Sequence, residues 1–291
     1  MKFLVLGSMN YDYTYVLDHI VKPGETVASC RMETACGGKG FNQAAALAKA
    51  GADVWLAGLV GGDGEELIET ARRYKVDCSL VRKTEGKTGH AVILLDKSGQ
   101  NSIVLFGGAN RMWTKAHIRE ALSGFGKGDI LVLQNEINEL PEVIEEACKR
   151  ELKIVLNPSP FETEILKSGT DKVSLFMLNE VEGEQMTGTG IPEEILDRML
   201  ERYPAAGVVL TLGPAGAYYA DSKKRLFCPA QKVTPVDTTA AGDTFTGFFL
   251  SAQAKGYEIG ECLRIAAKAS SVTVSRRGAS VSIPVWSEVI G

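Results

Sequence analysis

Short apolar runs that alternate with helical patterns constrain the fold of this chain more than any other feature of its sequence. The runs are rich in β-forming residues and lack polar interruptions, as expected for strands buried on both faces of a sheet. The candidate central strands are residues 3–6, 54–60, 130–133, 154–156, 175–178 and 208–211. Between them, apolar positions three and four apart predict amphipathic helices at residues 42–50, 65–75, 114–122, 139–150 and 193–202. The alternation predicts the α/β class, with a mainly parallel central sheet covered by helices.

Two regions near the start of the chain depart from this alternation. Residues 11–36 have no helical period and contain the turn signal Lys-Pro-Gly-Glu at positions 22–25. Residues 90–95 and 101–106 are β-rich and flank Lys-Ser-Gly-Gln, which is typical of a hairpin. We expect these extra strands to form a small separate sheet that covers the carboxyl ends of the parallel strands as a lid. An edge extension of the main sheet is the alternative.

Composition excludes several classes of protein. With 291 residues, 45% of them hydrophobic, the chain is neither a small disulfide-stapled scaffold nor a disordered polymer. Its 32 Lys and Arg residues against 36 Asp and Glu give a net charge of −4, which predicts no nucleic-acid partner. The six cysteines form no C-x-x-C pair, and no apolar run approaches the roughly 18 residues of a membrane span. We therefore expect a cytoplasmic protein with reduced thiols and no membrane partner.

The segment at positions 236–245, Val-Asp-Thr-Thr-Ala-Ala-Gly-Asp-Thr-Phe, places small residues and an acid before an apolar helix predicted at 245–254. A helix N-terminus offers unpaired backbone N–H groups, and small side chains let a phosphate approach them. Asp243 fits two roles there. It is either an N-cap residue of the helix or a general base that takes a proton from an acceptor hydroxyl. In the second role, the adjacent amides would hold the charge of a transferred phosphoryl group.

A second glycine-rich segment, Cys-Gly-Gly-Lys-Gly-Phe-Asn-Gln-Ala at positions 36–44, also leads into a predicted helix. It is not a Walker A loop, because Gly40 follows the lysine where Ser or Thr is required. It is not a dinucleotide fingerprint, because Gln43 stands where the third glycine belongs. The segment is either an ordinary turn with a solvated lysine or a loop that presents Lys39 and Asn42 to a polar ligand.

Polar or glycine-rich residues follow four of the candidate strands. Asn10 and Asp12 follow the first strand, and extended chain would point both side chains the same way. The other such segments are residues 134–136, 179–182 and 211–216. Open α/β sheets bind ligands at the carboxyl ends of their strands. Each segment alone could be an ordinary turn, but four of them at one sheet edge predict a shared ligand cleft.

These residues closely resemble the ribokinase branch of the phosphofructokinase-B sugar kinase family. The most specific motifs are Gly-Gly-Lys-Gly-x-Asn-Gln-Ala at 37–44 and Asp-Thr-x-Ala-Ala-Gly-Asp-Thr-Phe at 237–245, supported by segments 7–12, 22–26, 179–182 and 276–279. The resemblance covers essentially the whole chain. It implies a single three-layer α/β/α domain over residues 1–291, with a lid sheet inserted from about 11–36 and 88–108. It also implies ATP-dependent phosphorylation of a sugar's primary hydroxyl, O5 in the case of ribose.

The resemblance further implies a role for individual residues. Asp243 would be the catalytic base, and the amides of Ala240, Ala241, Gly242 and Asp243 the anion hole. The sugar would be held by Asn10, Asp12, Gly38, Lys39, Asn42 and Glu136, together with Asp243. ATP would contact Asn179, Thr211, Gly213, Gly216 and Gly242, and Glu182 would be associated with magnesium. A monovalent cation, usually potassium, would lie near Asp237, Thr239, Thr273, Arg276, Gly278 and Ser282. The lid would also pair two subunits into a homodimer.

Some positions leave the acceptor open. Phe41 stands where a small alanine is usual beside the sugar loop, and Ala267 stands where a polar residue near adenine is common. We expect a bulky Phe41 to reshape the sugar pocket and Ala267 to remove one contact with the base. We also expect the glycines of the sugar loop, the nucleotide loop and the anion hole to lie where a Cβ would obstruct a ligand.

Ribose is the leading substrate hypothesis. A related kinase for another furanose, a nucleoside or a sugar acid is the alternative within the same enzyme class. A non-catalytic sensor of sugars or nucleotides on the same fold is less favoured, because Asp243 and Gly242 are both present. A nicotinamide-dependent dehydrogenase would also suit the α/β pattern, but the chain has no dinucleotide fingerprint after its first strand.

Overall fold

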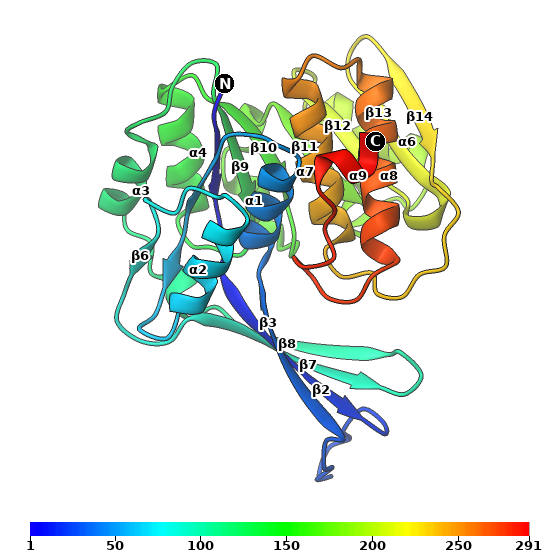
Figure 1. Cartoon of the computed structure of the whole chain (residues 1–291). Helices are drawn as coiled ribbons and strands as arrows, with labels where there is room; N and C mark the ends of the chain where they lie inside the picture. The colour runs from blue at the N-terminus through cyan, green and yellow to red at the C-terminus, as the bar shows by residue number, and fades with distance from the viewer. Residues whose placement is uncertain (291) are drawn as a thin grey trace.

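A twisted eight-stranded sheet forms the centre of the protein, whose computed structural model describes residues 1–290 (Figure 1). The strand order is β14-β13-β12-β11-β10-β9-β1-β4. The strands are β1 Phe3–Leu6, β4 Val54–Ala57, β9 Ile130–Gln134, β10 Lys153–Asn157, β11 Leu175–Asn179, β12 Gly207–Thr211, β13 Gly216–Ala220 and β14 Arg225–Pro229. From β4 to β12 every pairing is parallel, whereas β13 and β14 add an antiparallel hairpin at one edge.

Helices cover both faces of this sheet, so the core has three layers. Phe3 and Val5 of β1 point into one apolar cluster, and Leu4 and Leu6 point into the other, as the two-residue period of a strand requires. The helices of the first cluster are α1 Lys39–Lys49, α2 Glu65–Arg73, α7 Ala241–Ala254, α8 Ile259–Val274 and α9 Trp286–Ile290. Those of the second are α3 Lys115–Leu122, α4 Leu140–Lys149, α5 Glu180–Thr187 and α6 Pro192–Arg202.

A separate four-stranded sheet projects from the core (Figure 1). Its strands are β2 Asn10–Leu17, β3 Arg31–Gly37, β7 Gly89–Asp96 and β8 Asn101–Phe106, in the order β3-β2-β7-β8. Because β2 follows β1 after only a short connection, the lid begins where a central strand ends. The prediction of a small separate sheet is confirmed, and the alternative of an edge extension is wrong.

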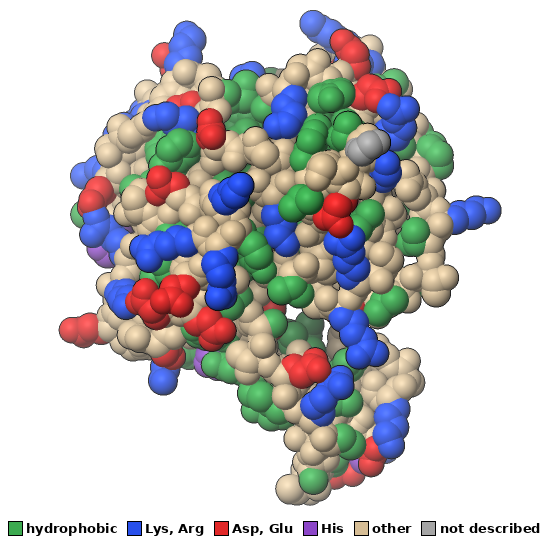
Figure 2. All heavy atoms as spheres, in the orientation of Figure 1, with side chains coloured by type: hydrophobic (Ala, Val, Ile, Leu, Met, Phe, Trp, Pro, Cys, Tyr) green, Lys and Arg blue, Asp and Glu red, His purple; other side chains and the backbone are tan. Residues whose placement is uncertain are grey.

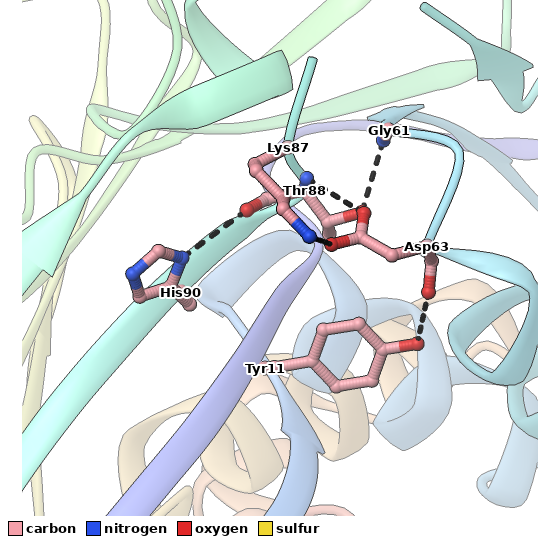
Figure 3. A network of polar contacts seen from close by, with 6 residues as sticks. All are labelled: Tyr11, Gly61, Asp63, Lys87, Thr88 and His90. Atoms are coloured by element: carbon pink, nitrogen blue, oxygen red, sulfur yellow. Dashed lines mark hydrogen bonds and ion pairs between the residues drawn. The ribbon is translucent and has the colours of Figure 1, made fainter.

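The base of the lid is tied to the core by one polar network (Figure 3). The carboxylate of Asp63 accepts hydrogen bonds from the backbone N–H of Thr88 at 2.9 Å and from its hydroxyl at 2.6 Å. Lys87 Nζ lies 3.4 Å from the same carboxylate, and Tyr11 of β2 donates its hydroxyl to the Asp63 carbonyl at 2.8 Å. The Thr88 hydroxyl accepts from the N–H of Gly61 at 2.9 Å. Strand β2 and the start of β7 are therefore both held by the turn that follows β5 (Leu59–Val60). Strand β5 itself pairs with β6 (Arg82–Lys83).

Three elements differ from the sequence-based prediction. The predicted strand 54–60 is divided at Gly58, where a Cβ would lie 2.6 Å from Met9 Sδ. Helix α7 begins at Ala241, before the predicted start at Phe245. The hairpin of β13 and β14 was not predicted. Within residues 1–290, no helix combines the length and the apolar character needed to cross a membrane.

Candidate active site

The carboxyl ends of the parallel strands meet the N-terminus of α7 at a cavity of about 220 Å³. The cavity is lined by the following residues: Lys39, Asn157, Met177, Leu178, Asn179, Glu182, Thr211, Thr238, Ala240, Ala241, Gly242, Asp243 and Thr246. A second cavity, of about 590 Å³, adjoins it, and Thr211, Thr238, Ala241 and Gly242 line both. Residues from distant parts of the sequence are thus brought to one edge of the sheet, as predicted for this fold class.

The first turn of α7 offers free donors to the smaller cavity. Ala240 precedes the helix with a φ of 60°, in the left-handed region, and no side chain caps the helix. Among the described residues, the N–H groups of Gly242 and Asp243 have no hydrogen-bond acceptor, whereas the N–H of Ala241 reaches Thr238 O at 3.3 Å. These free N–H groups, at the positive end of the helix dipole, suit an anion. Asp243 lies within the first turn, so its interpretation as the N-cap residue is wrong.

Asp243 is held by the helix that follows the glycine-rich loop. Its side chain is buried, and its Oδ2 accepts from Asn42 Nδ2 at 3.3 Å while Oδ1 accepts from Gln43 Nε2 at 2.9 Å. Helices α1 and α7 can approach this closely because Gly247 has no side chain; a Cβ there would lie 2.4 Å from the Cβ of Ala46. The two motifs singled out in the sequence therefore meet at one carboxylate.

Asn10 opens strand β2 and is oriented by Asn110. The Nδ2 of Asn110 donates to Asn10 Oδ1 at 2.7 Å, and its Oδ1 accepts from the N–H of Met9 at 3.0 Å. With its oxygen occupied, Asn10 keeps an N–H₂ group for a ligand. The buried Asn110 lies in a short 3₁₀ turn after β8, and our sequence reasoning missed it because such a turn has no apolar period.

Asp12, Glu136 and Asp243 bring three carboxylates together. Burial, together with the charges of Glu136 and Asp243, raises the pKa of Asp12 to about 7. Glu136 accepts from the N–H of Lys39 at 3.0 Å and from the hydroxyl of Ser8, so it also fixes the glycine-rich loop against the end of β1. A ligand rich in hydroxyl groups would supply the donors that this acidic cluster needs.

The glycines divide into two groups. In Gly38, Gly40 and Gly216 the nearest obstacle to a Cβ is the protein backbone, at 3.0 Å from Asn10 N, 2.6 Å from Ser8 N and 2.2 Å from Cys228 O respectively. Gly38 and Gly216 also have positive φ angles of 92° and 133°. For Gly213 and Gly242 a Cβ would meet no atom within 4 Å.

The glycines of the first group are required by close packing of the chain on itself, whether or not a Cβ there would also obstruct a ligand. Obstruction of a ligand stays a prediction for all five glycines, and it has no competing explanation from packing at Gly213 and Gly242. Both line the larger cavity, and Gly242 lines the smaller one as well.

The larger cavity has an apolar lining contributed by Val233, Pro235, Phe245, Ala267 and Val274. Thr211, at the end of β12, and the nearby Gly213 and Gly216 also line it. Such a cavity suits a flat apolar ring whose polar extension reaches the smaller cavity.

Phe41 does not line either cavity. It is buried in the core and packs edge-on against Tyr74, with the ring centroids 6.4 Å apart. These two cavities do not include Asn10 or Asp12, so the expected reshaping of the sugar pocket by Phe41 stays a prediction. The ring belongs to the apolar cluster that also contains side chains of α1 and α2.

Asn179 and Glu182 form a capping box at the start of α5. Asn179 Oδ1 accepts from the N–H of Glu182 at 2.8 Å, and the Glu182 carboxylate accepts from the N–H of Asn179 at 3.0 Å. Asn157 Nδ2 adds a further bond to this carboxylate at 3.2 Å. Both residues line the smaller cavity. Within residues 1–290 no cluster of three or more His, Cys, Asp or Glu side chains could hold a metal ion. One buried carboxylate fits a magnesium ion that keeps water and phosphate ligands.

The residues predicted to surround a monovalent cation lie on two loops that meet at Asp237. Its carboxylate accepts from the N–H of Thr239 and from the N–H of Gly278, each at 2.9 Å. Burial raises the pKa of Asp237, but hydrogen bonds from Thr239 and Gly278 outweigh this effect and hold the pKa below its ordinary value. A carboxylate beside loop carbonyls is a hard-oxygen environment that suits such an ion.

The other residues predicted at the cation site already make contacts of their own, which leave only some of their oxygens for an ion. The side chain of Arg276 pairs with Glu288 at 2.6 Å and points to solvent. The hydroxyl of Thr273 bonds Thr244 at 3.0 Å, and its carbonyl accepts from the N–H of Arg276. Ser282 is buried and donates its hydroxyl to Ala279 O at 2.7 Å.

Comparisons with known proteins agree with this geometry. Residues 2–286 match the model of the pfkB family of carbohydrate kinases. The ribokinase of Bacillus subtilis is 37% identical over 98% of the chain and 97% of its own length, and a deoxyribokinase of Salmonella typhimurium is 29% identical over 98% and 96%. The solved structure of Arabidopsis thaliana ribokinase complexed with ribose and ATP superposes with a TM-score of 0.88 at 31% identity, covering 99% of this chain and 97% of that one. The chain therefore belongs to the pfkB family of carbohydrate kinases, as a phosphotransferase of the ribokinase type.

Proposed function

We propose that the protein transfers the γ-phosphoryl group of ATP to O5 of D-ribose. The observation that supports this most directly is the position of Asp243. A buried carboxylate lies in the same helical turn as two free N–H groups, and that turn lines a cavity continuous with a larger apolar one. The similarity to ribokinases over nearly the whole chain supports ribose as the acceptor.

In this proposal the sugar lies between the lid and the start of α1. Its hydroxyl groups donate to the carboxylates of Asp12 and Glu136, while Asn10, Lys39 and Asn42 supply donors and Gly38 allows close approach. Asp243 Oδ2 takes the proton from O5 as the bond between O5 and the γ-phosphorus forms, and the bond from this phosphorus to the β–γ bridging oxygen breaks so that ADP leaves. The N–H groups of Gly242 and Asp243 hold the charge on the phosphoryl oxygens, and Ala240 and Ala241 shape the turn that exposes these groups.

ATP occupies the two adjoining cavities in this proposal. Adenine lies in the larger cavity near Ala267, and the phosphates extend past Thr211 and Gly213 to Asn179. Gly216 contributes by shaping the loop. Magnesium, held mainly by the phosphates with Glu182 nearby, would neutralise part of their charge. A potassium ion at the loops of Asp237 would fix the approach of the chain to α7. The cytoplasm is the location that a supply of ATP favours.

The substitution Asp243→Asn tests the role of the base. It keeps the size of the side chain but removes the proton acceptor, so we expect kcat to fall by about 10²- to 10⁴-fold. Ribose affinity should change little, since the amide still reaches the sugar. Turnover is measured by coupled ADP release and binding by calorimetry. Near-normal turnover in this variant would reject Asp243 as the base.

The acceptor is tested separately with a panel of ribose, 2-deoxyribose, hexoses, sugar acids and nucleosides. The similarity to a deoxyribokinase makes 2-deoxyribose the most informative competitor. Assays with and without potassium ask whether the cation is needed. A higher kcat/KM for a nucleoside would overturn ribose, and no turnover on any member would favour a non-catalytic sensor.

The lid offers a surface for a second copy of the chain. Strand β8 is an edge strand, and its side chains Ile103, Val104, Leu105 and Phe106 are all exposed. Figure 2 shows the lid standing away from the core, with hydrophobic side chains at its surface. An apolar edge strand of this kind is suited to pairing with another sheet. A homodimer formed through the lid is therefore part of the proposal.

A further inference from the structure

We infer that Gln43, itself held by Gln134, is a positioning residue for the base. This inference rests on the proposed role of Asp243. Gln43 Nε2 donates to Asp243 Oδ1 at 2.9 Å, and Gln134 Nε2 donates to Gln43 Oε1 at 2.6 Å. Gln43 is 1% exposed and Gln134 is 0% exposed. Neither lines the cavities, so Gln43 reaches Asp243 from the side away from them and Gln134 lies behind Gln43.

The chain of two amides has a fixed direction. An ionised carboxylate only accepts hydrogen bonds, so Gln43 must turn its N–H₂ group toward Asp243. Its oxygen then faces Gln134, which must in turn present N–H₂. Gln134 comes from the end of β9 and Gln43 from α1, so the sheet and the helix together set the orientation.

The same contacts give the two oxygens of the Asp243 carboxylate different roles. Oδ1 receives the short bond from Gln43, whereas Oδ2 receives only the longer bond from Asn42 at 3.3 Å. Oδ2 is thus the oxygen available to a substrate hydroxyl. With Oδ1 fixed, the carboxylate cannot rotate freely about χ2, and the reacting oxygen keeps one direction. This is the preorganisation expected of a group that acts in a transition state.

A packing role for the two glutamines would have a different signature. Loss of buried hydrogen bonds between α1, α7 and β9 would lower stability and leave the kinetics of the folded enzyme unchanged. A positioning role lowers kcat, because the carboxylate has lost the donor that orients it. It leaves KM for ribose nearly unchanged, since neither glutamine lines the ligand cavities.

The variants Gln43→Met and Gln134→Met test the inference in the full-length protein. Methionine keeps the length of the side chain and removes its donor. We expect Gln43→Met to lower kcat about 10- to 100-fold, the size of one hydrogen bond to a charged group. Gln134→Met should lower kcat by a smaller factor, because it keeps the direct bond from Gln43 to Asp243. It also serves as the test if Gln43→Met does not fold.

A double-mutant cycle then tests whether Gln134 acts through Gln43. Once Gln43→Met is present, Gln134→Met should cause no further loss of kcat. Thr170→Val is the matched control: it removes a buried hydrogen bond to Tyr203 at 3.1 Å that contacts neither cavity, and it should lower stability only.

The outcomes separate the two proposals. A wild-type kcat in Gln43→Met, beside an inactive Asp243→Asn, rejects the positioning role and leaves the base intact. An active Asp243→Asn rejects the base itself. Additive losses of kcat in the cycle reject transmission through Gln43.

Discussion

Asp12, which we propose binds the sugar, is buried where its ionisation costs stability. It lies on β2 against Gly37, where a Cβ would be 2.0 Å from its Oδ2, and it faces the other two carboxylates of the site. Burial, and to a smaller extent the charges of Glu136 and Asp243, raise its pKa to about 7. A carboxylate is thus kept where ionisation is unfavourable until a ligand supplies hydroxyl donors. Such groups are typical of functional sites.

The substitution Asp12→Asn should make the free protein more stable at pH 8. In the unfolded chain the carboxyl titrates near 3.8, so between about pH 4 and 7 the folded state binds a proton that the unfolded state does not. The stability of the wild type therefore falls as pH rises through this window. We expect the variant to exceed the wild type by about 2–4 kcal/mol at pH 8 and by much less at pH 4.

Urea unfolding at pH 8, 6 and 4.5 measures this difference, and a difference that is constant with pH contradicts it. The same variant should bind ribose more weakly, because it loses an acceptor for the sugar hydroxyls. In the wild type, KM for ribose should rise as pH falls below about 7, because Asp12 is then protonated in the free enzyme.

At the scale of elements, the first turn of α7 separates the needs of folding from those of activity. A Cβ on Gly242 meets no protein atom within 4 Å, yet Gly242 lines both cavities. We expect Gly242→Val to fold with nearly wild-type stability and to lose most of its kinase activity, because the side chain enters the space of the phosphates. Gly260→Ala in α8 is the control, since its Cβ is equally free and lines neither cavity.

Thermal unfolding and ADP release are measured on both variants. Full activity in Gly242→Val would overturn the anion-binding role of this turn. Gly40→Ala should behave in the opposite way, because its Cβ would lie 2.6 Å from Ser8 N. We expect this variant to lose thermal stability, whether or not its kinase activity also changes.

The elements were predicted from the sequence to the extent that apolar periodicity determines them. The strand predicted at residues 3–6 is β1, and the lid strands were recognised by their lack of a helical period. The start of α7 was missed because residues 241–244 carry no apolar signal, and the left-handed Ala240 can be identified only from its φ. The contacts of Asn110, Gln43 and Gln134 join segments far apart in the chain, which no local pattern records.

For the whole molecule, the exposed apolar edge of the lid predicts association. Wild-type protein should sediment as a dimer at micromolar concentration, and Val104→Lys should shift it toward the monomer by placing a charge on β8. Val104 is 65% exposed, so the substitution should not unfold the chain. Val181→Lys, at a residue of α5 that is 61% exposed, is the matched control. A monomeric wild type at these concentrations contradicts the lid dimer.

The network at the base of the lid has a consequence for how the lid can move. Tyr11 and Thr88 fasten its two inner strands to the turn at Asp63 (Figure 3), whereas the far ends of these strands project away from the core (Figure 1). Because the lid is fixed at one end only, we expect any displacement to grow with distance from Asp63. Asn10 and Asp12 lie near this fixed end, so we expect them to move least. We therefore expect the proposed sugar ligands Asn10 and Asp12 to keep their positions if the far end of the lid closes over the site and excludes water.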